Sequence, residues 1–257
     1  MKLGIIGYGA IGSFVARSIK NGLLKKYRVV LVFDLDREKL DKAQKEGFDT
    51  TDNFDDFLNY GFDMVMESAS QQAARIYLPD LVKKGYSVLV MSGGVFADTA
   101  FKIHIEELAE KNNARVYVPS GAISGLDGIE AMMFAGNLKV ILETRKNPRS
   151  LGREDREDVI IFEGGAREAA MKFPRNINVA MALALATEHP ENVRVRIISD
   201  PEVKTNTHTI IAEGNSGKMK IVVENVPFPE NPKTSFLAAL SALQILKKIT
   251  QSFVIGG

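Results

Sequence analysis

The chain has 257 residues, of which 45% are hydrophobic and 25% charged, a composition that is ordinary for a folded globular protein. Its formal net charge of +1 argues against a broad electrostatic attraction to nucleic acid or to an anionic membrane. It contains no cysteine, which excludes disulfides, cysteine metal sites and thiol nucleophiles, and no run approaches the ~20 apolar residues of a membrane span. We find no secretion signal in residues 1–19, and the composition fits a cytoplasmic protein.

Residues 1–120 alternate between strand patterns and helix patterns. Pro79 falls within the third helix pattern and is expected to kink or split that helix. The alternation predicts an α/β domain over residues 1–121, with a doubly wound parallel sheet of Rossmann type and helices on both of its faces. The strands are expected at 2–6, from 28 to Asp34 or Asp36, at 62–70 and at 114–122, and a further strand in 86–98 enters a glycine-containing loop. The helices are expected at 10–21, 36–47, 71–85 and 99–113.

Three glycines stand where the first strand pattern gives way to the first helix pattern. Gly7 would make the tight turn, Gly9 would let a pyrophosphate approach the backbone, and Gly12 would let the helix pack closely on the strand. The free N–H groups at the helix start, among them those of Ala10 and Ile11, would face the phosphates. The spacing G-x-G-x-x-G therefore predicts a dinucleotide site. The alternative is a glycine-rich turn that has lost its ligand.

An acidic residue follows the second strand pattern. Asp34 lies about 20 residues past the glycines, where a carboxylate can accept both ribose hydroxyls of NAD and would repel a 2′-phosphate. Arg37 stands close by and could receive such a phosphate, or it could be a solvated side chain in the first turn of the next helix. Ala69, among the small residues that end the third strand pattern, is expected to line the same site. We therefore expect NAD as the cofactor, with NADP as a second.

After Ala122 the alternation ends, and several strand patterns follow one another. They predict a second, α+β domain over residues 122–235, with a largely antiparallel sheet. The last helix pattern, over residues 236–257, is expected to pack back on the first domain. Strands are expected at 138–147, 157–166, 192–201, 205–214 and 218–226, with a charged loop at 146–157, and helices at 125–136, 176–187 and 234–249.

The chain has three histidines, and their settings differ. His104 lies in an amphipathic helix pattern and is expected on the surface, and His189 follows a helix pattern and is expected to cap it. His208 lies in a strand whose alternate positions also carry Lys204 and Asn206. Such a polar face is either solvated or lines a cleft, and the pattern does not decide between the two. Histidine is the usual proton carrier at neutral pH, so His208 is the candidate for acid–base chemistry.

Four segments resemble the L-aspartate dehydrogenase family: "VPSGAISGLDGI", "FPRNINVAMALALA", "DPEVKTNTHTI" and "NVPFPENPKTSFLAALSAL". The similarity runs over nearly the whole chain. It implies a Rossmann domain, a second α/β domain and a homodimer. It also implies oxidation of L-aspartate to iminoaspartate with NAD or NADP, after which the imine hydrolyses to oxaloacetate and ammonia or is consumed in NAD synthesis.

The resemblance also assigns roles to single residues. The family's catalytic histidine corresponds to His208, and its two cofactor contacts correspond to Ala122 and Asn178. A residue at the position of Asn178 could instead cap the N-terminus of its own helix. Two alternatives to this activity stay open. One is a related two-domain oxidoreductase that acts on another acidic imine or semialdehyde, and the other is a catalytically silent dinucleotide-binding regulator.

The two carboxylates of L-aspartate need cations or hydrogen-bond donors. Arg167 is one candidate, because a planar guanidinium suits a bidentate contact with a carboxylate. Lys233, Thr234 and Ser235, in "NPKTS", form the other. The alternatives are a surface arginine and a helix N-terminus that Thr234 or Ser235 caps. We expect no metal site.

Overall fold

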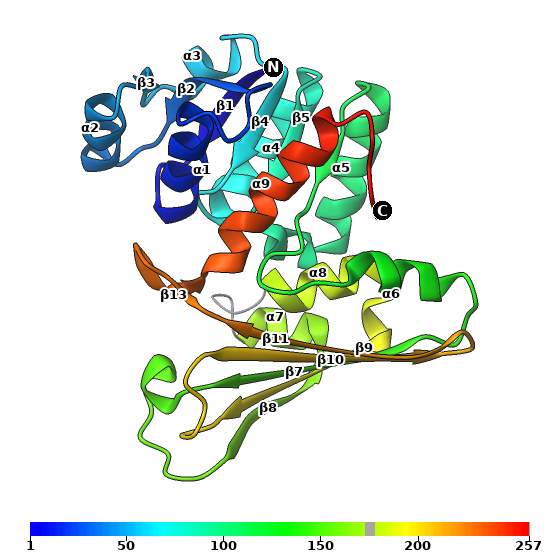
Figure 1. The fold of residues 1–257 in the computed structure, drawn as a ribbon. Helices are drawn as coiled ribbons and strands as arrows, with labels where there is room; N and C mark the ends of the chain where they lie inside the picture. The colour runs from blue at the N-terminus through cyan, green and yellow to red at the C-terminus, as the bar shows by residue number, and fades with distance from the viewer. Residues whose placement is uncertain (173–177, 257) are drawn as a thin grey trace. The chain divides into compact units, whose positions relative to one another are not determined.

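The computed structural model describes residues 1–172 and 178–256 (Figure 1), without the side chains of Ala170, Met171, Pro232 and Lys233. The chain divides into two compact units. The first unit is Met1–Pro119 with Ala239–Phe253, and the second is Ser120–Ala238 with Val254–Gly257. Within the described ranges, no helix has the length and apolar character that crossing a membrane requires.

The first unit is built on a six-stranded sheet in the order β3-β2-β1-β4-β5-β6, in which every neighbouring pair is parallel. The predicted sheet of Rossmann type is therefore confirmed (Figure 1). Its strands are β1 Lys2–Ile6, β2 Arg28–Phe33, β3 Thr50–Thr51, β4 Met64–Glu67, β5 Ser87–Val90 and β6 Val116–Tyr117. Its helices are α1 Ala10–Lys20, α2 Arg37–Lys45, α3 Phe54–Leu58, α4 Gln71–Lys83, η1 Gly93–Ala97, α5 Thr99–Lys111 and most of α9 Phe236–Thr250.

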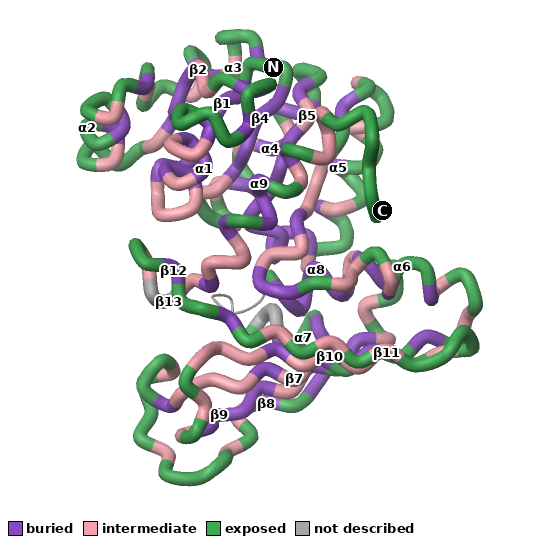
Figure 2. Tube along the Cα trace, in the orientation of Figure 1, coloured by how far each residue is buried: buried purple, intermediate pink, exposed green. Residues whose placement is uncertain are grey.

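The central strand β1 is buried from Leu3 to Ile6 (Figure 2), as expected of a strand between two helical layers. Leu3 and Ile5 belong to a core cluster that also contains Val15 of α1 and Leu243 of α9. On the other face, a Cβ added at Gly4 would lie 2.8 Å from the rings of Phe57 and Phe62, so only glycine lets these aromatic rings reach the strand.

The structure differs locally from the expectations for the first unit. The strand expected over 114–122 is only the two residues of β6, and neither β3 nor α3 was expected. Pro79 lies inside α4, which is continuous through it, so the helix is not split, while the expected kink stays a prediction. Proline in a helix costs about 3 kcal/mol, and here the fully buried Leu78, Leu81 and Val82 of the same helix offset that cost.

The second unit contains a five-stranded sheet in the order β11-β10-β7-β9-β8 and a two-stranded sheet of β12 and β13. The larger sheet is antiparallel except for the parallel pair of β7 and β9. Its strands are β7 Lys139–Lys146, β8 Val159–Gly165, β9 Val193–Ser199, β10 Asn206–Gly214 and β11 Gly217–Asn225, and the smaller sheet has β12 Pro227–Phe228 and β13 Asn231–Ser235. The helices are α6 Leu126–Met133, η2 Pro148–Leu151, α7 Ala166–Lys172, α8 Asn178–Ala186 and η3 Pro190–Asn192.

Helix boundaries in the second unit differ from the expectations. Thr234 and Ser235 end the strand β13, where Ser235 pairs with Pro227, so they do not begin the last helix. That helix, α9, ends at Thr250, short of residue 257. The short α7 was not expected, and the expected start of the apolar helix at 176 lies outside the described residues.

The larger sheet of the second unit has one buried face. Along β7 the side chains alternate, so that Val140, Leu142 and Thr144 are buried while Ile141 is 45% exposed. Helices α6, α7 and α8 contact strands of this sheet and cover the buried face (Figure 1). On β10 the same face carries His208, together with fully buried Ile210.

Candidate active site

The glycine turn between β1 and α1 has the packing that the motif predicts. Gly7 has φ +91°, in the left-handed region that favours glycine, and a Cβ there would lie 2.7 Å from the backbone nitrogen of Ala69. A Cβ at Gly12 would overlap the carbonyl oxygen of Gly7. A Cβ at Gly9 would meet nothing within 4 Å. Two of the glycines are therefore required by the protein's own packing, while Gly9 faces open space that a ligand can enter.

The start of α1 offers donors to that space. Its first helical hydrogen bond runs from Ser13 N to the carbonyl oxygen of Gly9, at 3.0 Å. The N–H groups of Ala10, Ile11 and Gly12 therefore have no partner within the helix itself. Their dipoles concentrate positive potential at the N-terminus, which suits a pyrophosphate.

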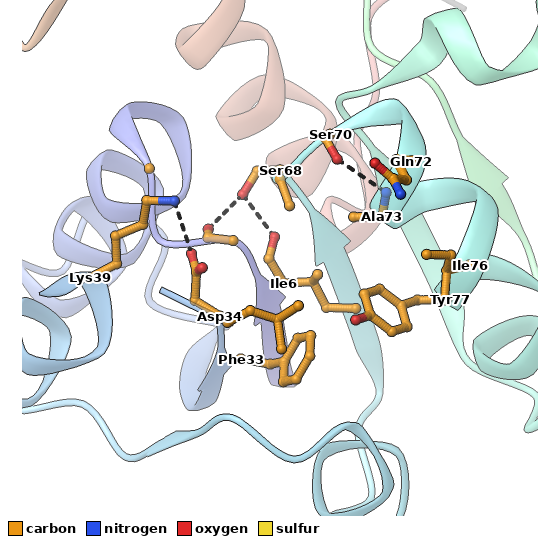
Figure 3. Close-up of a pocket in the computed structure, with 14 residues that line it drawn as sticks. Ile6, Phe33, Asp34, Lys39, Ser68, Ser70, Gln72, Ala73, Ile76 and Tyr77 are labelled. Carbon is orange, nitrogen blue, oxygen red and sulfur yellow. Dashed lines mark hydrogen bonds and ion pairs between the residues drawn. The ribbon is translucent and has the colours of Figure 1, made fainter. Parts of the chain in front are cut away.

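A pocket of about 420 Å³ lies beside the turn (Figure 3). It brings together four of the residues that the sequence assigned to the dinucleotide: Gly7, Gly9, Asp34 and Ala69. Ser68 Oγ donates to the carbonyl oxygen of Gly7 at 2.9 Å, and so holds the turn from the β4 side. The pocket's other lining residues are Ile6, Phe33, Leu35, Lys39, Ser68, Ser70, Gln72, Ala73, Ile76 and Tyr77.

Asp34 is held in the wall of this pocket with its side chain only 11% exposed. Its Oδ2 accepts a hydrogen bond from the backbone N–H of Tyr8 at 2.8 Å, and its Oδ1 accepts one from Asp36 N at 3.0 Å. Each carboxylate oxygen can accept a further hydrogen bond, so the group can also bind ribose hydroxyls.

A cation that the sequence did not single out also lines the pocket. Lys39 Nζ lies 3.7 Å from Asp34 Oδ2 and 3.5 Å from Asp36 Oδ2. Arg37, the residue considered for a 2′-phosphate, has a side chain that is 76% exposed, pairs with Asp41 and does not line the pocket. The sequence feature that could have identified Lys39 as a pocket residue is its place in the first turn of the helix that follows Asp34.

Glu67, at the end of β4, was also missed. It is fully buried and accepts hydrogen bonds from Ala69 N at 2.8 Å, Ser70 N at 3.1 Å and Ser92 N at 3.1 Å. Burial raises the pKa of Glu67, and these hydrogen bonds oppose the rise. Since Ala69 and Ser70 line the pocket, the carboxylate fixes part of the pocket wall. The sequence feature that could have identified Glu67 is an acidic residue at the end of an apolar strand pattern.

His208 is 5% exposed on the buried face of the second unit's sheet, so it does not belong to a solvated face, whereas Asn206 is partly buried and Lys204 is exposed. Its register partner on β7 is Thr144, and Thr144 Oγ1 lies 3.0 Å from His208 Nδ1. Burial, and to a smaller extent the positive charge of Lys146, lower the pKa of His208 from 6.5 to about 4. The imidazole is therefore neutral at neutral pH, with one ring nitrogen unprotonated, and it is a weaker base than an ordinary histidine.

The two cofactor contacts inferred from the resemblance lie in the second unit. The carbonyl oxygen of Ala122 accepts a hydrogen bond from Asn225 Nδ2 at 3.0 Å, and both residues are buried. Asn178 is exposed at the first position of α8. Asn225, the last residue of β11, was not considered from the sequence, although it positions Ala122. The cofactor roles of Ala122 and Asn178 stay predictions.

The candidates for the substrate carboxylates are not gathered into one described cluster. Arg167 is exposed on α7, and Thr234 Oγ1 accepts a hydrogen bond from Asn231 Nδ2 at 3.1 Å. Ser235 is buried, and the side chain of Lys233 lies outside the described residues. These four assignments stay predictions.

The other two histidines lie on the surface. His104 is exposed on α5, and the side chain of His189 is 62% exposed with Nδ1 3.1 Å from Glu191 Oε1. His189 precedes η3 and does not cap α8 with its side chain.

Among the side chains that the structure describes, no three of His, Asp or Glu type are grouped to hold a metal ion.

Two protein-family models match the chain. One, described as "Aspartate dehydrogenase, C-terminal", matches residues 127–249, which include His208. The other, described as "Homoserine dehydrogenase, NAD binding domain", matches residues 7–119, which include the glycine turn and Asp34. The nicotinamide dinucleotide domain predicted from the glycines and Asp34 is thereby supported.

Curated relatives are similar over the full length. An L-aspartate dehydrogenase of Archaeoglobus fulgidus is 41% identical over 260 residues, covering 99% of this chain and all of the relative. One of Methanosarcina barkeri is 39% identical over 270 residues, covering all of this chain and 99% of the relative. The crystal structure of aspartate dehydrogenase from Thermotoga maritima is similar with a TM-score of 0.83 and 28% identity, covering all of this chain and 99% of that one.

Proposed function

The chain belongs to the aspartate dehydrogenase family, and from this premise we propose that it oxidises L-aspartate to iminoaspartate with a nicotinamide dinucleotide. The observation that carries the proposal is the full-length similarity to L-aspartate dehydrogenases, at 39% and 41% identity. The pocket of the first unit and the buried His208 of the second supply the groups that this chemistry needs. The imine then hydrolyses to oxaloacetate and ammonia or is consumed in NAD synthesis.

The residues of the first unit fit a bound dinucleotide. The N-terminus of α1 would hold the pyrophosphate, and Asp34 would accept the ribose hydroxyls. We propose NAD as the preferred cofactor, because a carboxylate at this position repels a 2′-phosphate. NADP is the second cofactor, because Lys39, 3.7 Å from Asp34, partly offsets that repulsion and can itself bind the phosphate.

In the proposed reaction, a proton leaves the substrate's amino nitrogen while the Cα hydrogen leaves with its electron pair. When bound, oxidised nicotinamide accepts that hydride. His208 would take the proton from the amine, or activate the water that hydrolyses the imine. For either role the suitable tautomer has Nδ1–H donating to Thr144 Oγ1, which leaves the lone pair of Nε2 available. Thr144 would then act by positioning the ring.

We also propose that the protein acts as a homodimer in the cytoplasm. The dimer rests on the resemblance of the sequence to the family, in which homodimers are usual. A symmetric pair is also the commonest assembly of soluble proteins. Light scattering at micromolar concentration tests it, with a mass of twice that of one chain expected and the mass of a single chain contradicting it.

The test of the activity is an initial-rate assay of the purified protein. L-Aspartate is supplied with NAD or with NADP, and formation of the reduced nicotinamide is followed by its absorbance. Other acidic amino acids and semialdehydes serve as competing substrates. Turnover that is fastest with L-aspartate supports the proposal. Faster turnover of another acidic substrate would favour a related oxidoreductase, and dinucleotide binding without turnover would favour a silent regulator.

A further inference from the structure

We propose that Lys146 is a substrate-binding residue and that its ammonium group binds one of the two carboxylates of the substrate. This inference deepens the proposed function and rests on it. Lys146 was not among the residues that the sequence assigned to the substrate. What singles it out is the register of the second unit's sheet, which places it on the same face as His208.

The placement follows from the alternation of β7. Val140, Leu142 and Thr144 point to the buried face, so Lys146, two residues further along, points to that face as well. Thr144 is the register partner of His208 and touches its ring. Two residues of a strand span roughly 6–7 Å. The ammonium on its flexible stem can therefore reach the space beside the imidazole.

The other cations of β7 lie elsewhere. Lys139 is exposed on the outer face of the strand. Arg145 also points outward, and its guanidinium binds Glu143 at 2.9 Å, Asp158 at 2.7 Å and Asp200 at 2.8 Å. Three carboxylates already neutralise Arg145, so it has little left to offer a substrate anion. Of the three cations of this strand, Lys146 is the one that shares the face of His208.

The electrostatic setting of Lys146 favours an anionic ligand. Its positive charge contributes to the lowered pKa of the imidazole, which agrees with the place of the two residues on one face of the sheet. Burial lowers the pKa of Lys146 itself, because the cation is poorly solvated. Charge-assisted hydrogen bonds in such a setting are about twice as strong as neutral ones. Lys146 thus supplies the charge for a carboxylate while the neutral His208 supplies a base for a proton.

The test compares Lys146→Met with Lys139→Met. Methionine keeps an unbranched apolar stem and removes the charge, and Lys139 is the matched control on the exposed face of the same strand. Losing a hydrogen bond to a charged group should raise the KM for L-aspartate about 10- to 100-fold in Lys146→Met. The KM for NAD should stay as in the wild type. Lys139→Met should change neither the KM for L-aspartate nor the KM for NAD. Lys146→Arg, which keeps a positive charge, should have a KM for L-aspartate between those of the wild type and Lys146→Met. An unchanged KM for L-aspartate in a folded Lys146→Met would overturn the assignment.

Two further readouts do not depend on turnover. Calorimetric titration with succinate, a dicarboxylate without the amino group, should show weaker binding to Lys146→Met than to the wild type. The pKa of His208, followed by NMR, should rise in Lys146→Met, because a neighbouring positive charge is gone. Equal succinate binding, or an unchanged His208 pKa, would overturn the proposal even if Lys146→Arg proved unstable.

Inhibition by two substrate analogues identifies which carboxylate of L-aspartate Lys146 binds. Activity of the wild type separates this inference from the proposed function. L-Asparagine lacks the side-chain carboxylate, and the α-amide of L-aspartate lacks the other. One of these two analogues lacks the carboxylate that Lys146 binds. That analogue should inhibit the wild type and Lys146→Met equally, because it makes no contact with Lys146 in either protein. If inhibition by both analogues weakens equally, Lys146 binds neither carboxylate specifically. A wild-type protein that does not oxidise L-aspartate refutes the proposed function, whereas failure of the present inference appears only as the absence of a difference between wild type and variant.

Discussion

The backbone N–H of Tyr8 donates a hydrogen bond to Oδ2 of Asp34, at 2.8 Å. This contact joins the middle of the glycine turn to the residue that follows β2. The turn is the expected pyrophosphate site and Asp34 the expected ribose site, so one carboxylate links the two parts of the dinucleotide pocket. A change at Asp34 therefore acts on the shape of the turn as well as on the ribose contact.

We predict that Asp34→Ser weakens NAD binding and improves binding of NADP. The substitution removes a ribose acceptor and a charge that repels the 2′-phosphate. Asp34→Asn is the matched control, because its amide oxygen can still accept the hydrogen bond of Tyr8 while the charge is lost. Fluorescence titration with both cofactors measures the effect. If NAD affinity is unchanged in Asp34→Ser, Asp34 does not contact the ribose.

Lys39→Ala should weaken NADP binding more than NAD binding. Lys39 lines the pocket 3.7 Å from Asp34, where its ammonium can pair with a 2′-phosphate. Losing one charge-assisted contact predicts a decrease in NADP affinity of about tenfold. Arg37→Ala is the control, since that side chain is 76% exposed and pairs with Asp41. Equal effects of the two substitutions on the ratio of NADP to NAD affinity would count against a role for Lys39.

Thr144→Val should lower kcat with L-aspartate by about tenfold and leave NAD affinity unchanged. Valine has nearly the shape of threonine, but it cannot hold His208 Nδ1, which lies 3.0 Å from Thr144 Oγ1. An unsatisfied buried ring nitrogen should also cost about 1–3 kcal/mol of stability. Thr209→Val, at the next position on β10 but on the other face, is the control. A Thr144→Val enzyme with wild-type kcat would show that ring orientation does not limit the reaction.

The buried His208 predicts a stability that falls in acid. Its pKa is about 4 in the folded protein against 6.5 for an ordinary histidine, so between these values the unfolded chain binds the additional proton. The free energy of unfolding should therefore decrease by up to about 3 kcal/mol as the pH falls from 6.5 to 4. Denaturant midpoints at a series of pH values measure this, and His208→Asn should lack that component. Parallel pH curves for the two proteins would contradict it.

Much of the first unit could be predicted because its signals are local. Gly7 and Gly12 are required by contacts with Ala69 and with each other, and the spacing of the glycines encodes those contacts directly. Asp34 could be placed because the end of a parallel strand always lies at the same edge of the sheet as the turn. Lys39 was missed because the direction of a side chain in the first turn of a helix depends on the exact start of that helix, at Arg37.

The second unit was harder to predict, because its site depends on pairing between distant strands. Thr144 and His208 are 64 residues apart and meet only through the register of β7 with β10. A shift of β10 by one residue against β7 would put the two side chains on opposite faces of the sheet, and the sequence of either strand alone does not show which residue of the other it pairs with. The same pairing, with the alternation of β7, puts Lys146 on the same face of the sheet as His208. Thr234 and Ser235 suited a helix start equally well, and their pairing in β13 gave them an extended conformation.

The most direct measurement is the turnover of L-aspartate by His208→Ala beside the wild type. We predict that kcat falls by about 10²–10⁴, the usual contribution of general acid–base catalysis, because the group that carries the proton is gone. NAD affinity should stay near the wild-type value, since the glycine turn and Asp34 belong to the first unit. The exposed His104 and His189 provide the matched alanine controls and should change neither quantity. A folded His208→Ala protein that oxidises L-aspartate at the wild-type rate would contradict the account.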